Sequence, residues 1–570
     1  MLRRLLGLET EYAIGVSPRD GPRSATNAEA YAAIRKAIEA QILTQPGEAS
    51  LQQIFLVNGG SISYESLPWA RGDGLVEGGT AECRSPGAAL LMQRAQDALL
   101  VRSLPLAELD LAQQGRPVRL SLRKNCRDAE DNIYGAQESY DAEFARGLAL
   151  GVWRGGLVVL LPVALLSTLG TWIVALVALL LAIVSLVLLG VSGLVSSRVR
   201  RSALFEGLFG EASDLAFERT LARPFSMIER ALWEPVMRPF FWLAAAVGFG
   251  RLRRQAMPFL VTRPVLTGAG TLHRDGRFGL SEKGPAMVRL SRRSVAPEDR
   301  CIWDGGNLCK SMIGLAMFRW RRFGSLFARR QRLQLGLSDS NVTQVAEYLK
   351  VGTTALVLDM VEAGVLSDLP RLRRPLLALH AVIDDPTLRA TVTWGDETLT
   401  ALEVQRRYWA RARQFVHQSP TPSLEAAELV ELWGRTLDGL EQDRASQVGR
   451  VDWVTKQFLL ETSGEGEPWA VRKTIDLKLH QLGPQGYLAQ LEAEGLAPRL
   501  VSEQEVAVAI EQPPADSPAQ RRSRLIRELG DQPAEVKVYW DRVRVGGPIR
   551  GRVIRLADYR PSERSEDDSS

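Results

Sequence analysis

The sequence predicts an α+β fold that is interrupted by a membrane insertion, and three observations support this prediction. Short alternating segments near both ends of the chain are typical of β-strands. Apolar residues three and four positions apart dominate the second half and are typical of helices. Residues 155–197, between these parts, contain no charged side chain. A chain of 570 residues is long enough for two or three domains.

Composition narrows the classes of function. Charged residues make up 24% of the chain, and 71 basic against 66 acidic residues leave a net charge of only +5, which gives no case for nucleic acid. Four scattered cysteines and four histidines exclude a disulfide framework and argue against zinc. We therefore expect any metal to be a hard cation such as Mg2+, held by carboxylates. The apolar run before Glu9 is too short for a signal peptide, so we expect the soluble parts in the cytoplasm.

The body is predicted element by element from residue periodicity. The N-terminal 145 residues read as short strands with one amphipathic helix, and the chain becomes helical from residue 341. The acidic, serine-rich tail 561–570 is predicted to be disordered. The predicted strands are residues 5–16, 53–64, 118–124 and strand-like alternation over 535–556; the predicted helices are 28–43, 345–363, 399–418, 424–440 and 487–495.

The uncharged segment 155–197 would be roughly 64 Å long as one straight helix, about twice the thickness of a bilayer core. Two interpretations stay open: one tilted span with an interfacial extension, or a helical hairpin with its turn around residues 167–171. Arginines flank both ends, which places both ends in the cytoplasm and favours the hairpin. Residues 231–250 suit a helix at the membrane surface or a packed soluble helix.

Acidic residues recur on one face of the N-terminal strands. Glu9 and Glu11 are two residues apart, so both carboxylates project from the same side. A solvated sheet face would carry the same pair, since two such carboxylates repel each other unless solvent or a cation separates them. Glu65 shares a face of the second strand with Ser61 and Ser63.

A glycine-rich segment follows and adds three polar residues, Glu77, Thr80 and Glu82. Its two glycines, Gly78 and Gly79, allow the backbone to approach a phosphate closely. Carboxylates that converge from different strands are a common way to hold Mg2+ for nucleotide phosphates. The pattern therefore favours a site for Mg2+ and a nucleotide.

Residues 7–12, Gly-Leu-Glu-Thr-Glu-Tyr, resemble the G-x-E-x-E-[YF]-G signature of the Pup ligase and Pup deamidase family, the proteasome accessory factor A family. The strongest further agreement lies in residues 338–341 and 348–359. The resemblance covers most of the chain except roughly 146–256 and 295–328. The other matching segments are residues 58–59, 77–83, 124–125, 134–140, 258–263, 267–270, 433–435, 452–453 and 512–514.

The resemblance implies a glutamine-synthetase-like fold: a curved antiparallel sheet forming a cradle, helices packed behind it, and a small C-terminal domain. In this sequence an inserted transmembrane helical hairpin is added. Ligases of the family use ATP to phosphorylate the C-terminal glutamate of Pup, a small disordered tag, which a substrate lysine then attacks. Deamidases of the family convert a C-terminal glutamine of Pup to glutamate and also remove Pup. Acyl-phosphate formation activates a poor electrophile, and Mg2+ offsets the phosphate charge.

The resemblance also implies roles for individual residues. Glu9 and Glu77 fall where the family binds magnesium, with Glu11 and Glu82 as neighbouring acids. Thr80 falls where the family contacts the nucleotide. Trp540 resembles the tryptophan of the C-terminal domain that lies beside ATP, although an ordinary core tryptophan fits the same position equally well.

The sequence departs from the family at the catalytic strand, N-G-A-R-x-Y-x-D. Ser61 replaces the arginine, Ser63 the tyrosine and Glu65 the aspartate. The longer glutamate keeps a base but moves it, and a misplacement of ~1 Å can cost a factor of about 100 in rate. Loss of the arginine removes a bidentate phosphate clamp.

A second departure is the missing N-T-R-D-E-P-H motif. Residues 318–332 form a basic, aromatic stretch instead, and Gln334 stands where the family usually has histidine. Three readings of these arginines stay open: contacts to phosphates, contacts to anionic lipid headgroups, or a solvated basic helix.

The sequence thus predicts a membrane-anchored, ATP- and Mg2+-dependent enzyme that attaches, deamidates or removes a Pup-like tag, with Glu65 as general base. The alternative is an inactive family member that acts as a membrane scaffold for a Pup-like peptide or a proteasome component. A short loop after the first strand favours a ligase, whereas residues 384–392 favour a deamidase. Expected partners are the Pup-like modifier, its target proteins, proteasome components and the lipid bilayer. Expected domains are 1–145 with 257–485 (catalytic type), 146–256 (membrane insertion), 486–560 (C-terminal) and the tail.

Overall fold

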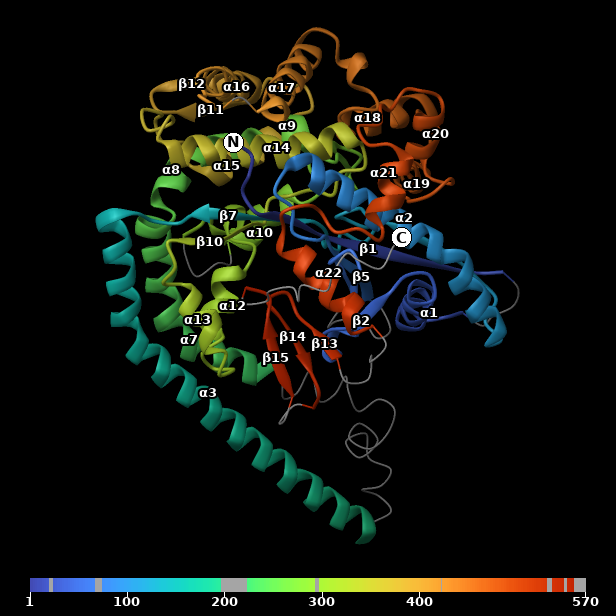
Figure 1. Ribbon diagram of the computed structural model, residues 1–570, viewed down its shortest axis with the longest axis vertical. Coiled ribbons are helices and arrows are strands. Elements are labelled where there is room, and N and C mark those ends of the chain that lie inside the picture. Colours follow the sequence, from blue (N-terminus) through green and yellow to red (C-terminus); the bar gives the residue numbers. More distant parts are fainter. Residues whose placement is uncertain are drawn as a thin grey trace, which may run out of the picture.

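A computed structural model describes residues 1–19, 24–66, 74–195, 223–292, 297–421, 423–530, 536–547 and 551–557, so the predicted tail lies outside the described residues. Its centre is an eight-stranded sheet in the order β10-β7-β1-β5-β4-β3-β2, with β6 paired to β1, and every pairing is antiparallel (Figure 1). The strands are β1 (Leu6–Pro18), β2 (Thr44–Pro46), β3 (Ile54–Leu56), β4 (Ser61–Ser66), β5 (Gly74–Gly79), β6 (Val118–Arg123), β7 (Gln137–Glu143) and β10 (Arg330–Leu335).

Strict alternation along β1 gives the sheet one buried face and one polar face. Tyr12 is fully buried, and its hydroxyl donates to Asp97 of α2 (Pro86–Gln113) at 2.7 Å. Thr10, on the same side of β1, donates to Gln93 of α2 at 3.0 Å. The helix α2 therefore covers one face of the sheet and leaves Glu9 and Glu11 on the other.

Helices form the layer behind α2, as Figure 1 shows. The buried helix α14 (Gln344–Ala363) packs against α2, α8 (Gly250–Thr262) and α17 (Leu424–Gln442). The predicted helices 28–43, 345–363, 399–418, 424–440 and 487–495 are confirmed as α1 (Asn27–Glu39), α14, α16 (Ala401–His417), α17 and α20 (Tyr487–Ala493). Capping boxes begin α1 and α16, in which Glu29 and Glu403 reach back to the N-cap threonines.

Two predictions for the N-terminal part are wrong. The segment 53–64 is not one strand, because a turn at Gly59 (φ 88°) separates β3 from β4. The first 145 residues also hold a second helix, α2, which is 28 residues long. Helices α1, α14 and α21 (Glu503–Ala509) and strands β1 and β6 all contact α2, so its apolar residues are spread around the helix and give no single stripe.

The insertion consists of α3 (Gly147–Val195) and α7 (Arg223–Leu243). The turn predicted around residues 167–171 is wrong, because α3 runs through it without a break. Thr168 and Thr171 donate to the carbonyls of Ala164 and Ser167 at 2.9 and 2.8 Å, so their hydroxyls are satisfied inside the helix. At 1.5 Å per residue, α3 is about 74 Å long.

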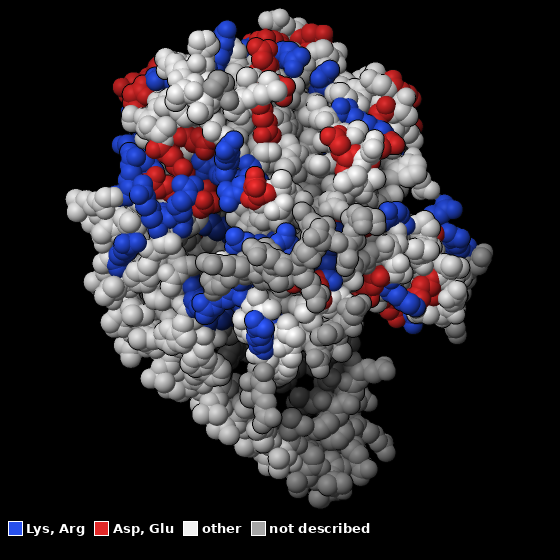
Figure 2. Space-filling model, in the orientation of Figure 1, with Lys and Arg blue, Asp and Glu red and all other residues white. Residues whose placement is uncertain are grey.

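The chain folds back through α7, which lies antiparallel to α3. Gly170 of α3 lies against Leu232 of α7. Gly156, which is nearer the body of the protein, lies against Leu243 of α7. Among the described residues one helix, Gly147–Leu181, is long and apolar enough to cross a membrane, and only 17% of its most apolar window is buried. Figure 2 shows no charged side chain along the lower half of this helix.

The C-terminal part reaches back to the central sheet. Its small sheet, β13 (Val536–Val538), β14 (Arg542–Val545) and β15 (Arg552–Arg555), corresponds to the alternation predicted over residues 535–556. Arg522 of α22 (Pro518–Glu528) is fully buried and donates to the carbonyl of Gly59 at 2.7 and 3.0 Å. This contact fixes the C-terminal part beside the turn between β3 and β4.

The remaining elements complete the body around this frame. They are η1 (Ala49–Leu51), η3 (Ala244–Gly248), α9 (Pro264–Thr267), β8 (Thr271–Leu272), β9 (Phe278–Gly279), α10 (Gly284–Arg292), α11 (Arg300–Trp303), α12 (Asn307–Ile313), α13 (Trp320–Ser325), α15 (Pro375–Ile383), β11 (Thr391–Trp394), β12 (Glu397–Thr400), η4 (Arg444–Gln447), α18 (Asp452–Ser463) and α19 (Trp469–Leu479).

Candidate active site

Three strands bring the predicted acidic residues together on the face of the sheet opposite α2. The register places Glu11 of β1 directly opposite Glu77 of β5, and Ser63 of β4 opposite Glu77 on its other side. Ser63 donates to Glu77 Oε2 at 3.1 Å. Because residues opposite each other share a face, Glu9, Glu11 and Glu77 project from the same side, as the alternation predicted.

Burial and mutual repulsion raise the pKa values of this cluster. Burial first, and then the charge of Glu65, raise the pKa of Glu11 to about 7, although the backbone N–H of Gly135 donates to its carboxylate at 2.8 Å. Burial, Glu9 and Glu65 raise the pKa of Glu77 to about 7. Burial also raises the pKa of Glu65, and Glu9 adds to the effect. A cation placed among these groups would relieve their repulsion.

Two basic residues on the C-terminal side of the insertion face the cluster. Arg332 of β10 forms a short ion pair with Glu9 and donates to Ser139 Oγ at 2.9 Å. Gln334 donates to Glu9 Oε2 at 3.1 Å. Lys310 of α12 lowers the pKa values of Glu65 and Glu77, against the larger effect of burial. Lys310 was missed by the sequence reasoning, since no local pattern connects α12 to β4.

The four predicted magnesium ligands differ in their surroundings. Glu82 lies apart from the other acids and is paired with the buried Arg522. Among the residues that the structure describes, no three side chains of His, Cys, Asp or Glu are grouped closely enough to hold a metal ion. The carboxylate oxygens of Glu11 and Glu77 are nevertheless the type of ligand that a hard ion such as Mg2+ prefers. The assignment of Glu9, Glu11, Glu77 and Glu82 as metal ligands stays a prediction.

The two predicted nucleotide contacts lie close to this cluster. Thr80 is buried, and its hydroxyl accepts from the backbone N–H of Leu8 at 3.0 Å, which ties the end of β5 to β1. Trp540, 39% exposed, packs edge-on against Phe55 with ring centroids 5.1 Å apart. A Cβ atom on Gly79 would lie 3.0 Å from the Trp540 ring. The indole thus rests on the sheet next to Glu9, the residue opposite Gly79.

The raised pKa values predict a stability that falls with pH. Between pH 4.5 and about 7 the folded protein keeps protons on Glu11 and Glu77 that the unfolded chain has released, so the free energy of unfolding decreases as pH rises through this window. For one carboxyl group the loss is on the order of 3 kcal/mol. With a chelator present, we expect a lower melting temperature at pH 8 than at pH 5.5, and a weaker pH dependence in Glu77→Gln.

The surface variant Glu39→Gln, at the exposed C-terminal end of α1, serves as the control and should melt with the pH dependence of the wild type. An unchanged pH dependence in Glu77→Gln would show that the Glu77 carboxyl does not retain its proton in the folded protein.

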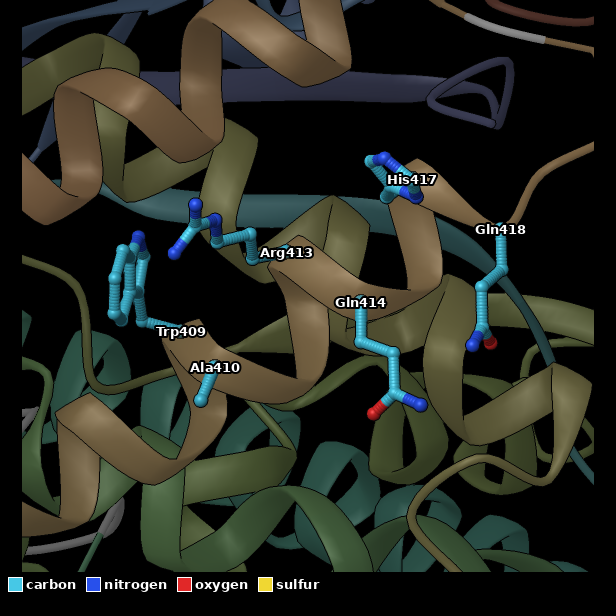
Figure 3. A pocket seen from close by; sticks show the side chains of 6 residues that line it. All are labelled: Trp409, Ala410, Arg413, Gln414, His417 and Gln418. Carbon is cyan, nitrogen blue, oxygen red and sulfur yellow. The ribbon is translucent and has the colours of Figure 1, made fainter.

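A separate hollow of about 280 Å³ lies on the surface of α16 (Figure 3). All of its lining residues come from this helix and its C-cap, and none is a carboxylate. Trp409 donates its indole N–H to Val430 O at 2.9 Å, and the Arg413 guanidinium lies 5.7 Å from the Trp409 ring. Arg413 and His417 are the only charged or titratable groups that line this hollow, and no carboxylate faces them there, so the carboxylate cluster of the sheet is the candidate active site.

Comparison with known sequences identifies the family of the chain. The family described as Pup-ligase protein matches residues 4–544. The chain is 35% identical over 320 residues to the Pup deamidase/depupylase of Mycobacterium tuberculosis (strain ATCC 25618 / H37Rv), which covers 54% of this chain and 60% of that protein. It is 30% identical over 320 residues to the Pup–protein ligase of Acidimicrobium ferrooxidans, covering 55% and 67%. The chain therefore spans less than two thirds of the length of the deamidase.

Two solved structures share the fold. The complex between the prokaryotic ubiquitin-like protein Pup and its ligase PafA has a TM-score of 0.65 at 21% identity, covering 98% of this chain and 89% of that chain. The ligase PafA in complex with ADP has a TM-score of 0.60 at 20% identity, covering 89% and 86%. These matches confirm the predicted fold class, an antiparallel sheet cradle with helices packed behind it.

Proposed function

Because this chain belongs to the Pup-ligase protein family, we propose that it is a membrane-anchored enzyme of Pup-type protein modification that depends on ATP and Mg2+. It attaches a Pup-like tag to target proteins, or it deamidates or removes the tag. One observation carries the proposal: half-buried carboxylates from β1 and β5 meet on a single sheet face, with the more exposed Glu65 of β4 at its edge and an aromatic side chain from the C-terminal part beside it.

Each residue of the cluster has a proposed role. Glu11 and Glu77 hold Mg2+, with Glu9 beside them, and the bound ion offsets negative charge on the phosphates. Trp540 would stack on the adenine ring of the nucleotide. Thr80 ties the end of β5, on which the Trp540 ring rests, to β1. Glu65, whose pKa is raised above its ordinary value by burial, is proposed as the general base that accepts a proton from the attacking group.

The membrane part of the proposal rests on α3. Its exposed apolar side chains have no charged neighbour on the helix after Arg154, and exposing such a surface to water is unfavourable. We place the catalytic sheet on the cytoplasmic side of the inner membrane, because Arg154 marks the end of the uncharged segment that joins the body. A Pup-like modifier, its targets and proteasome components would meet the enzyme at this surface.

A specific observation favours a second candidate, the inactive membrane scaffold. Arg332 forms an ion pair with the carboxylate of Glu9. The serines at positions 61 and 63 leave β4 without a cationic side chain that could bind a phosphate. In that case the carboxylates are neutralised by the protein itself, and the fold serves to bind a Pup-like peptide or a proteasome component.

The test uses the full-length protein in detergent with ATP, MgCl2 and Pup-like peptides that end in glutamine or glutamate. A ligase gives ADP together with an isopeptide product, and a deamidase gives conversion of glutamine to glutamate by mass spectrometry. Absence of both products and of ATP turnover, at peptide concentrations where binding is detected, would overturn the enzyme and leave the scaffold.

A further inference from the structure

An exposed basic and aromatic loop lies directly against the apolar helix α3. Trp172 of α3 donates its indole N–H to the carbonyl of Ala316 at 2.9 Å, and its ring lies 5.5 Å from that of Phe318. Beyond this contact, Met317, Phe318 and Trp320 are 61%, 62% and 54% exposed. Three bulky apolar side chains in so short a loop are unfavourable in water unless another surface covers them.

The same loop concentrates positive charge. Arg319, Arg321 and Arg322 are exposed, and among the described residues only Arg319 forms an ion pair, with Glu48 at 3.8 Å. Partial burial and the charge of Arg319 lower the pKa of Arg322, against the smaller opposing effects of Glu48 and Asp541. Residues 317–322 thus combine exposed aromatic rings with an excess of positive charge, a composition that suits the boundary between a bilayer and water.

Charges on α7 show how deep the helices can enter a bilayer. Glu234 and Arg238 are 50% and 64% exposed, with 3.8 Å between their charged groups, and α7 carries them alongside the part of α3 that precedes Gly170. Hydrocarbon would strongly disfavour these groups. Arg230, which is also exposed, precedes Leu232 by two residues and extends these charges to about the level of Trp172. The bilayer core therefore begins beyond Trp172, within residues 173–195 of α3, which have no charged side chain.

We propose that residues 317–322, together with Trp172, form a headgroup-binding surface that rests on an anionic lipid bilayer where α3 enters it. In Figure 1 the lower half of α3 extends away from the body just below α13. The aromatic side chains lie at headgroup depth and the three arginines contact lipid phosphates.

Because the chain continues from this surface into β10, which carries Arg332, the candidate active site lies on the side of the body that faces the membrane. This inference rests on the membrane anchoring proposed above and adds the lipid class and the depth.

The test reconstitutes the full-length protein in nanodiscs of phosphatidylcholine with about one third phosphatidylglycerol, with an environment-sensitive fluorophore on single introduced cysteines. Met317→Cys reports on the proposed surface and Leu188→Cys on α3. The control is Leu424→Cys, far from both, because Leu424 of α17 is 75% exposed. Labelled wild type gives the background of the four native cysteines. We expect lipid-borne quenchers near the headgroup to quench position 317, quenchers in the acyl chain to quench position 188, and neither to quench position 424.

The outcomes separate this inference from the proposed anchoring. Quenching at 188 without quenching at 317 would overturn the headgroup surface and leave the anchor intact, whereas quenching at neither position would overturn both. A blue shift at 317 without lipid quenching would assign the surface to a protein partner, such as a second copy, and would also overturn the inference.

The choice of lipid is tested by charge. Arg319→Gln, Arg321→Gln and Arg322→Gln together should reduce the phosphatidylglycerol that co-purifies with the protein from mixed lipid by about twofold, and high salt should have the same effect on the wild type. The control removes an equal charge elsewhere, at the exposed Arg371, Arg373 and Arg389, and should leave the lipid ratio unchanged. Equal enrichment in both triple variants would refute headgroup binding by this loop.

Discussion

Glu65→Gln is expected to lower turnover of ATP and of a Pup-like substrate by about 10²- to 10⁴-fold, the range that a positioned general base contributes. Glu65 lies on β4 at the edge of the carboxylate cluster, and partial burial raises its pKa above its ordinary value. The amide keeps the size of the side chain but cannot accept a proton. Nucleotide affinity should change little, because Glu65 is not among the groups assigned to the metal or the nucleotide. Rate and affinity are measured on the same preparation.

Two further variants make this result specific. Glu65→Asp keeps the carboxylate but retracts it by one methylene, so an intermediate loss of up to about 100-fold is expected if reach is the determining factor. Glu39→Gln, at the exposed end of α1, removes a surface carboxylate and should leave turnover unchanged. Wild-type turnover in Glu65→Gln would refute the role of general base and return attention to Glu11 or Glu77.

The shared face of Glu9 and Glu11 was predictable from sequence because it depends on β1 alone. Alternation fixes Glu9 and Glu11 on one face whatever the rest of the chain does, and the partner strand supplies Glu77 by register. The partners of these acids were not predictable. Arg332 lies 323 residues from Glu9 in the sequence and Lys310 lies 245 residues from Glu65, and only tertiary packing brings each pair together.

The errors in predicting helices have physical causes as well. The polar residues of α3 at positions 167–171 look like a turn, yet each hydroxyl finds an acceptor, since Ser167 also donates to Leu232 O of α7 at 2.8 Å. The helix α2 carries Pro105 in its interior and contacts neighbours on several sides, so neither propensity nor a one-sided stripe revealed it. Periodicity succeeds where a helix has one buried face, as in α16.

The largest expected effect on stability is that of Arg263→Met. Arg263, between α8 and α9, is 2% exposed and donates to Glu138 of β7 at 2.8 and 2.9 Å, to Thr354 Oγ1 at 2.6 Å and to Leu337 O at 2.6 Å. Burial alone would raise the pKa of Glu138, but Arg263 and Lys350 hold it below its ordinary value. Removing the guanidinium leaves a charge buried without its partner, which costs about 3 to 5 kcal/mol.

This cost is measured as the change in free energy of unfolding in urea, followed by tryptophan fluorescence in detergent. The control is Arg35→Met, which breaks the 2.8 Å ion pair between Arg35 and Glu39 on the surface of α1. It should lower the free energy of unfolding by less than about 1 kcal/mol. Adding Glu138→Gln to Arg263→Met should recover part of the loss, because the buried charge is removed with its partner. A double variant no more stable than the single one would mean that Arg263 acts through its contacts to Thr354 and Leu337, and not through the charge of Glu138.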